Sequence, residues 1–187
     1  MTAAVSRAAV VLAAGAGTRF EGSEHKLRAE VDGESVLQRS VGAAITASIG
    51  PVIVVVGSDP FDDLLFKDVV VVAAQDWSEG QSRSLQTGLA AVRATGAQEM
   101  VIGLADMPWV TSQAWRAVAA KSGQLVVASY GGQRMPPVKI SEELWPELPT
   151  VGDFGARDLF VSHKELLVEV PVDGDGRDID SEADLAR

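Results

Sequence analysis

A glycine-rich segment reads Leu12-Ala-Ala-Gly-Ala-Gly-Thr-Arg-Phe-Glu-Gly-Ser-Glu-His-Lys26. It begins at the end of an apolar run, residues 8–13, that predicts a buried first strand. We refer to residues 12–26 as the glycine loop. Gly15 and Gly17 let its backbone approach a ligand closely and adopt positive φ. Successive backbone N–H groups in such a turn form a concavity that binds anions, and two cations, Arg19 and Lys26, would add charge for a polyphosphate. The loop therefore predicts a nucleotide-phosphate site at the end of the first strand.

Two other glycine-rich phosphate sites do not fit this loop. A P-loop requires Gly-Lys-Ser/Thr directly after the second glycine, whereas Thr18-Arg19 follows here. A dinucleotide fingerprint requires a third glycine at position 20, where the chain has Phe20. An ordinary strand-to-helix turn remains the structural alternative, and the cations behind the glycines argue against it.

The rest of the chain alternates short apolar runs with segments of helical periodicity. Such alternation predicts a mostly parallel sheet with right-handed crossovers. The run 135–140 contains two prolines and is predicted to be an edge strand, because proline cannot donate to a ladder. Strands are predicted at 8–13, 52–56, 69–74, 100–105, 125–129, 135–140 and 166–170, and helices at 35–48, 60–66, 84–95, 111–121, 141–148 and 154–162.

Length and composition narrow the class of protein. The 187 residues predict a single domain, 1–187, and 47% hydrophobic residues indicate a globular chain. No apolar run approaches the ~20 residues of a membrane helix, and no secretory signal pattern is visible, so we expect a cytoplasmic protein with no membrane partner. The absence of cysteine excludes disulfides, thiolate metal sites and a cysteine nucleophile. The formal net charge of −10 argues against a nucleic-acid partner.

The start of the glycine loop, Leu12-Ala-Ala-Gly-x-Gly-x-Arg19 with a later lysine, resembles the signature of the MobA/MocA-like nucleotidyltransferases, which attach CMP or GMP to molybdopterin. Four later segments resemble further motifs of this family, in the family's order: Trp77–Leu85, Leu104–Pro108, Gly152–Arg157 and Asp178–Leu185. The glycine loop and the Leu104 segment are similar to motifs of the whole superfamily, whereas the Trp77 and Gly152 segments are more similar to those of its cytidylyltransferase branch. The resemblance implies a three-layer α/β/α, Rossmann-like nucleotidyltransferase fold. Its half 1–110 would bind the nucleotide and its half 111–187 the acceptor.

The resemblance also implies an activity, namely transfer of CMP from CTP, or of NMP from another NTP, to molybdopterin with release of pyrophosphate. Ala13-Ala14 in place of Ala-Gly favours CTP. Mg²⁺ would be the cofactor, and a molybdoenzyme or its chaperone a candidate protein partner. Arg134-Met-Pro-Pro-Val138 stands where the family has a Gly-His-Pro-Val-like run, which weakens the identification of the acceptor. The alternatives are a sugar or polyol phosphate acceptor, or a non-catalytic nucleotide-binding protein that delivers a cofactor.

Three aspartates are candidate metal ligands. Asp106 directly follows the predicted strand 100–105, so it should share a rim with the glycine loop, and Mg²⁺ prefers one or two carboxylates with phosphate oxygens and water. A turn before Pro108 is the structural alternative, and the resemblance favours the metal role. Asp178 or Asp180 could complete the site, and Asp180 or Ser181 could instead cap a terminal helix.

The remaining site residues follow from the resemblance. Gly80, Ser82 and Ser84 would lie over the base and ribose, although Ser82 or Ser84 could also serve as a helix N-cap. Asp153 and Arg157 would bind the acceptor, with a surface salt bridge as the alternative for Arg157. The two histidines, His25 and His163, are predicted to be solvated. The expected nucleotide-binding set is Leu12, Ala13, Ala14, Gly15, Ala16, Gly17, Thr18, Arg19, Lys26, Gly80, Ser82 and Ser84.

In the expected reaction Arg19 and Lys26 would stabilise charge on the α-phosphate and the leaving group, while Asp106 would hold Mg²⁺. An acceptor phosphate is already a nucleophile at neutral pH, so no side-chain base is expected.

Overall fold

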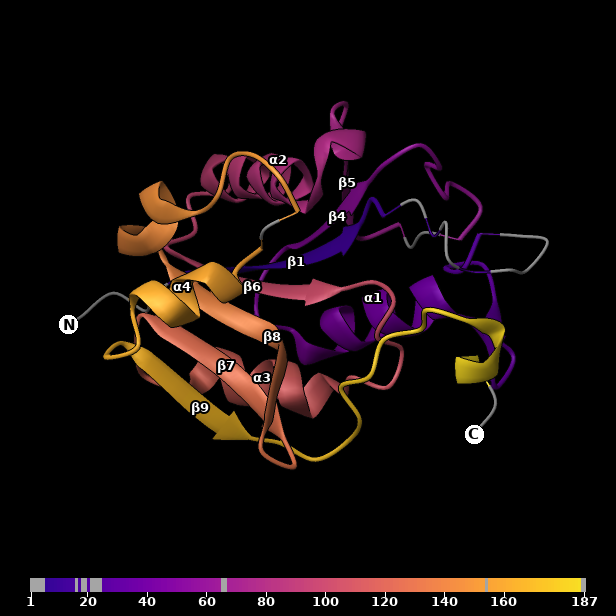
Figure 1. The fold of residues 1–187 in the computed structure, drawn as a ribbon. Helices are drawn as coiled ribbons and strands as arrows, with labels where there is room; N and C mark the ends of the chain where they lie inside the picture. The colour runs from indigo at the N-terminus through magenta and orange to yellow at the C-terminus, as the bar shows by residue number, and fades with distance from the viewer. Residues whose placement is uncertain are drawn as a thin grey trace.

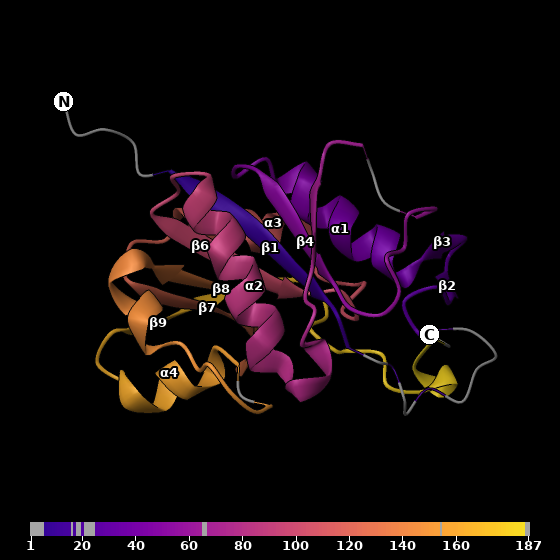
Figure 2. The same cartoon turned by 90° about the horizontal axis from the view of Figure 1, so that it is seen from above.

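The computed structural model describes residues 6–15, 17, 20, 25–64, 67–153 and 155–185. A seven-stranded sheet lies between two layers of helices (Figures 1 and 2), which confirms the predicted three-layer α/β fold. The strands are β1 (Arg7–Ala13), β4 (Val52–Val56), β5 (Val70–Ala73), β6 (Glu99–Leu104), β7 (Leu125–Tyr130), β8 (Gln133–Ser141) and β9 (Leu167–Pro171). Their order in the sheet is β5-β4-β1-β6-β8-β7-β9, with β8 antiparallel to both neighbours and the other pairs parallel.

Two of the helices begin at a side-chain cap. Ser35 accepts the Gln38 backbone N–H in a capping box at the start of one helix, and Thr111 accepts the Ala114 backbone N–H at the start of another. The α-helices are α1 (Val36–Ala47), α2 (Gln81–Ala94), α3 (Ser112–Ala120) and α4 (Arg157–Ser162), and the 3₁₀ helices are η1 (Trp77–Glu79), η2 (Glu142–Glu147) and η3 (Glu182–Leu185). No helix in the described parts of the chain is both long enough and apolar enough to cross a bilayer.

Alternation along the strands builds one hydrophobic core on each face of the sheet. Ala9 and Val11 of β1 pack with α1 and α3, while Ala8 and Val10 pack with α2, η2 and α4. β1 is therefore buried on both faces and lies inside the sheet, as its continuous apolar run predicts.

The order of the strands determines where a ligand can enter. From β1 the chain adds β4 and then β5 on one side, and it then returns to place β6 on the other side of β1. In such sheets ligands bind at this switch point, beyond the carboxyl ends of the strands. The register pairs Leu12 with Leu104, and the Ala105 N–H donates to the Leu12 carbonyl at 3.0 Å. The start of the glycine loop and Asp106 therefore lie on the same rim, as the sequence predicts.

The prediction that the proline-containing strand lies at an edge is wrong, because β8 lies between β6 and β7. The ladder with β7 shifts register there, so that Val127 is opposite Val138 and Ala128 is opposite Met135. Pro136 and Pro137 fall in this irregularity, where no ladder donor is required of them.

Two other local predictions also differ from the structure. The described part of the predicted helix 60–66 consists of turns, because Phe61 adopts a positive φ of 52° and donates its N–H to Asp59 Oδ1 at 2.9 Å. A short hairpin of β2 (Glu30–Val31) and β3 (Glu34–Ser35) was not predicted. Its turn is Asp32-Gly33, with both residues at positive φ, a sequence that does favour tight hairpins.

Candidate active site

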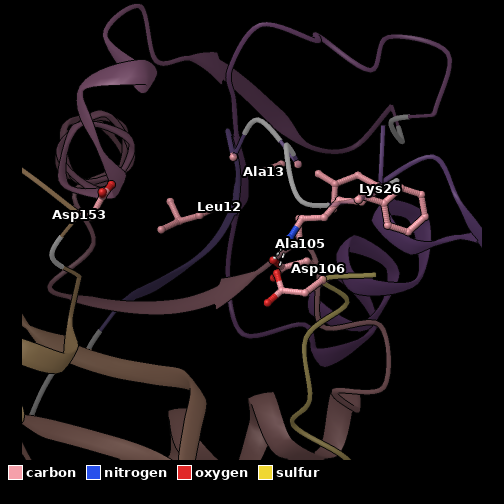
Figure 3. Close-up of a pocket in the computed structure, with 11 residues that line it drawn as sticks. Leu12, Ala13, Lys26, Ala105, Asp106 and Asp153 are labelled. Atoms are coloured by element: carbon pink, nitrogen blue, oxygen red, sulfur yellow. Dashed lines mark hydrogen bonds and ion pairs between the residues drawn. The ribbon is translucent and has the colours of Figure 1, made fainter. Parts of the chain in front are cut away.

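Most described residues of the glycine loop border a cavity of about 340 Å³ at the carboxyl ends of β1 and β6 (Figure 3), and Ala14 lines a neighbouring hollow. Its other walls come from the end of β6, from the segment before α4 and from the late part of the chain. The lining residues are Leu12, Ala13, Gly15, Gly17, Phe20, Lys26, Leu27, Ala105, Asp106, Asp153 and Asp180. Ala16, Thr18 and Arg19, which belong to the predicted set, lie outside the described residues.

Lys26 and Asp106 form the charged floor of this cavity. Lys26 Nζ donates to Asp106 Oδ2 at 2.6 Å, and the two side chains are only 12% and 20% exposed. Figure 3 shows the lysine reaching toward the carboxylate, with Asp153 on the other side of Leu12. The second carboxylate oxygen, Asp106 Oδ1, is buried and has no hydrogen-bond partner in the described parts of the chain. An unpaired buried carboxylate oxygen is costly and indicates a missing partner.

The late part of the chain returns to this rim through Ile179, a residue that the sequence analysis did not select. The Ile179 N–H donates to the Asp106 carbonyl at 2.9 Å, and the Ile179 carbonyl accepts from Lys26 Nζ at 3.1 Å. Its side chain is fully buried in the core beneath α1 and α3. Because Ile179 is buried there, the aspartates on either side of it, Asp178 and Asp180, lie close to the site.

The two aspartates beside Ile179 face different spaces. Asp180 Oδ1 lies 3.8 Å from Lys26 Nζ and lines the same cavity as Asp106, whereas Asp178 lines a neighbouring hollow. The Asp184 carboxylate accepts the Ser181 hydroxyl and the N–H groups of Asp180 and Ser181, so η3 is capped by Asp184. The Asp184 half of the predicted capping box therefore forms, while the Ser181 hydroxyl donates to Asp184 instead of accepting a helix N–H, and Asp180 still lines the cavity.

These residues fit a divalent cation such as Mg²⁺. The unpaired oxygen of Asp106 and the nearby carboxylate of Asp180 supply hard oxygen ligands, and Mg²⁺ needs few of these when phosphates and water complete its shell. No group of three or more acidic or histidine side chains suited to a metal occurs within the described residues, so a pre-formed all-protein cage is not present there.

A second hollow of about 310 Å³ adjoins the first and ends at the start of α2. Gly80 and Ser84 line it, together with Trp77. Ser82 does not, since its side chain is fully buried away from the hollow. The structural alternative, in which Ser82 or Ser84 caps the helix, is wrong, because α2 begins at Gln81 with Gly80 in the N-cap position. A Cβ at position 80 would lie 2.4 Å from the Gly152 carbonyl oxygen, so only glycine permits this approach of the two loops.

A third hollow, of about 460 Å³, extends toward α4 and contains both predicted acceptor residues, Asp153 and Arg157. Its lining combines apolar side chains with charged ones, which include Asp178. Arg157 forms no ion pair with a described carboxylate, and its guanidinium contacts Met135 Sδ at 3.6 Å. The predicted surface salt bridge is therefore not formed within the described residues. Leu12 and Asp153 line all three hollows, which makes them one continuous groove.

Both histidines, which were predicted to be solvated, are partly exposed and also have hydrogen-bond partners. His25 Nε2 lies 3.0 Å from the Gly15 carbonyl, inside the glycine loop. His163 Nε2 lies 2.7 Å from Glu147 Oε2, and this hydrogen bond raises the pKa of the imidazole. The position of His25 directly before Lys26 could have indicated that it lies near the site, but nothing in the sequence spacing identifies the Gly15 carbonyl as its partner.

Comparison with known proteins gives consistent matches over most of the chain. The family model described as the MobA-like NTP transferase domain matches residues 9–166. The purine catabolism protein PucB of Bacillus subtilis is 28% identical over 195 residues, covering 95% of this chain and 94% of that protein. The crystal structure of Rv0371c from Mycobacterium tuberculosis superposes with a TM-score of 0.84 at 27% identity, covering 98% of this chain and 96% of the other. A complex of Rv0371c with manganese gives a TM-score of 0.80 at 25% identity and covers 96% of each chain.

Proposed function

Because this chain belongs to the MobA-like NTP transferase domain family, a family of nucleotidyltransferases, we propose that it transfers the NMP group of a nucleoside triphosphate to a phosphorylated acceptor. The observation that carries this proposal is the Lys26–Asp106 pair beside the glycine loop. It provides a cation for phosphate oxygens and, in Asp106 Oδ1, a carboxylate oxygen that lacks a partner within the described chain.

In the proposed reaction an acceptor phosphate oxygen attacks the α-phosphorus in line. A new phosphorus–oxygen bond forms, the bond between the α-phosphorus and the bridging oxygen breaks, and pyrophosphate leaves. This chemistry depends on positioning and charge neutralisation more than on covalent catalysis. Backbone N–H groups of the glycine loop would bind the β- and γ-phosphates. Lys26 and Arg19 would stabilise the charge that develops on the α-phosphate and the leaving group.

The Mg²⁺ ion that accompanies a nucleoside triphosphate would be held by Asp106 with Asp180, the aspartate that lines the same cavity. When bound, the ion supplies positive charge to the phosphates. Lys26 neutralises the same carboxylates in the ligand-free protein and would be drawn toward the phosphates as they arrive. Asp178 lines the hollow assigned to the acceptor and is the weaker candidate ligand.

For the substrates we propose CTP as donor and a molybdopterin-type acceptor, with a molybdoenzyme or its chaperone as recipient of the product. The Ala13-Ala14 pair supports CTP. The position of Arg157 and Asp153 on the third hollow supports a phosphorylated acceptor there. The absence of the family's histidine beside Met135 favours the second candidate, a different acceptor such as a sugar or polyol phosphate.

A thermal-shift screen of the four NTPs with Mg²⁺, followed by a pyrophosphate-release assay, tests the proposal. A nucleotide present at 100 times its Kd stabilises the folded state by about 2.7 kcal/mol, which is easily measured. Stabilisation together with acceptor-dependent pyrophosphate release would support a transferase. Stabilisation without release by any phosphorylated acceptor would favour a nucleotide-binding delivery protein.

A further inference from the structure

His25 lies between the glycine loop and the turn that follows β4. Its Nε2 is 3.0 Å from the Gly15 carbonyl oxygen, and its Nδ1 is 3.2 Å from the Leu27 backbone nitrogen. The ring also meets the Phe61 ring edge to face, with the centroids 5.2 Å apart and an interplanar angle of 74°. The histidine therefore has a fixed partner in three directions.

These contacts define the protonation of the ring. The Leu27 N–H can only donate, so Nδ1 must accept and carries no proton. The Gly15 carbonyl can only accept, so Nε2 must donate its proton. Both contacts are satisfied together by the neutral imidazole with its proton on Nε2, and by no other form of the ring.

The turn behind His25 is itself held in place. Phe61 is fully buried and has positive φ, and its N–H donates to Asp59 Oδ1. The Arg28 guanidinium pairs with Asp59 and Asp63 and lies 5.2 Å from the centroid of the Phe61 ring. The hydrogen bond from Arg28 lowers the pKa of the Asp59 carboxyl, so the pair remains charged near neutral pH. His25 thus packs against a buried side chain whose own turn is held by hydrogen bonds and ion pairs.

The backbone at Gly15 needs such a contact. Glycine samples more backbone conformations than any other residue, and a Cβ at position 15 would meet nothing within 4 Å. Within the described residues, neither a backbone restriction nor a contact at the Cβ position therefore fixes the direction of the Gly15 carbonyl. Gly15 also lines both the first and the second hollow. A carbonyl oxygen turned into these hollows would repel a phosphate group, whereas a carbonyl held on His25 leaves the space to N–H donors.

We propose that His25 is a positioning residue for the glycine loop, which holds the Gly15 carbonyl away from the nucleotide through an Nε2–H hydrogen bond. Its effect on nucleotide binding rests on the function proposed above. The hydrogen bond and the order that it gives to the loop do not depend on that function. The two parts can therefore be tested separately.

The direct test uses the wild-type protein without nucleotide. Long-range ¹H–¹⁵N correlation spectra of the histidine rings at pH 8 should show His25 as the Nε2–H tautomer, assigned by comparison with His25→Gln. An Nδ1–H tautomer, or rapid exchange between the two tautomers, would overturn the proposal.

Four variants test the consequence for the loop. His25→Gln places an amide N–H near the position of Nε2, whereas His25→Asn places an oxygen near Nδ1 and cannot reach Gly15. Backbone hydrogen exchange in residues 12–28 should be about tenfold faster in His25→Ala and His25→Asn than in the wild type, and His25→Gln should restore most of the protection. His163→Gln, at the other histidine, should leave exchange in this segment unchanged. Equal exchange in the Gln and Asn variants, or no change in the Ala variant, would contradict the proposal.

Nucleotide kinetics complete the test. KM for the NTP should rise about tenfold in His25→Ala with a smaller fall in kcat, and it should recover in His25→Gln. A fall in kcat alone would contradict a positioning role. If the wild-type protein binds no nucleotide at all, the proposed function fails, and the tautomer and exchange measurements still decide the role of His25.

Discussion

Lys26 and Asp106 bring opposite charges within 2.6 Å of each other at the floor of the cavity. Replacement of Lys26 by alanine removes the cation assigned to the α-phosphate, and loss of one such transition-state donor typically lowers turnover by ~10²–10³. We expect Lys26→Ala to slow pyrophosphate release by this factor while its circular dichroism stays that of the wild type. Lys164→Ala, at an exposed lysine away from the cavity, should be fully active. A folded Lys26→Ala protein with unchanged turnover would remove Lys26 from the site.

Asp106→Asn removes a negative charge from the proposed metal site and leaves the shape of the side chain almost unchanged. The amide oxygen can still accept from Lys26, so we expect the fold to persist and the Mg²⁺-dependent activity to be lost. A titration of pyrophosphate release against Mg²⁺ measures this. Full activity with an unchanged Mg²⁺ dependence would leave Asp106 as a turn residue only.

At this scale the sequence predicts those site residues that directly follow buried strands. Asp106 and the glycine loop could be placed together because parallel strands end at one rim. The sequence does not predict which of Asp178 and Asp180 lines the same cavity as Asp106, because this depends on burial of Ile179 against distant parts of the chain. The contact of His25 with Gly15 likewise spans the glycine loop, whose path no periodicity describes.

Strand β6 and helix α3 pack closely against each other at Gly103. A Cβ at Gly103 would lie 2.4 Å from Trp115 Cζ2, and Trp115 is itself buried. We expect Gly103→Ala to lower the free energy of unfolding by about 1–3 kcal/mol, the usual cost of overpacking. Urea unfolding measures this loss. Because the two positions are in contact, Gly103→Ala with Trp115→Leu should cost less than the sum of the single variants. Strict additivity would show that the indole does not press on the strand.

His163 joins the end of α4 to η2 through its hydrogen bond to Glu147. This bond raises the pKa of His163 in the folded protein above its ordinary value of about 6.5. The stabilisation is then fully present below pH ~6.5 and is lost as the pH rises through the raised pKa. We expect the Tm of the wild type to exceed that of His163→Gln at pH 6 and to match it at pH 9. A difference that persists at pH 9 would assign the effect to packing instead.

The sequence predicts most elements and misses those that tertiary contacts decide. Val52–Val56 is continuously apolar, and α1 has clear signals at both ends, so both are found at their predicted positions. β8 lies inside the sheet because a register shift against β7 accommodates its prolines, and no local pattern reveals such a shift. The described part of 60–66 is not helical because Asp59 binds the Phe61 N–H, a competition that helical periodicity does not register.

At the scale of the whole molecule, one groove runs along the carboxyl edge of the sheet from the glycine loop to α4. The alternation of strands and helices predicted the layers, and the switch at β1 and β6 explains where the groove lies. Leu12 and Asp153, common to all three hollows, join the end assigned to the phosphates to the end assigned to the acceptor.

We expect CTP to be the preferred donor and molybdopterin the acceptor. Backbone groups near Ala13 and Ala14 would hydrogen-bond the pyrimidine edge while the loop at Gly80, held closely against Gly152, covers the base. A site that hydrogen-bonds one base edge leaves buried polar groups unpaired with the wrong base, which produces large discrimination. The assay supplies molybdopterin with each NTP in turn and measures the dinucleotide product. Product from GTP alone would contradict the donor. Stabilisation by CTP and Mg²⁺ without product from any NTP would contradict the acceptor and direct the search to other phosphorylated compounds that fit the hollow beside Arg157.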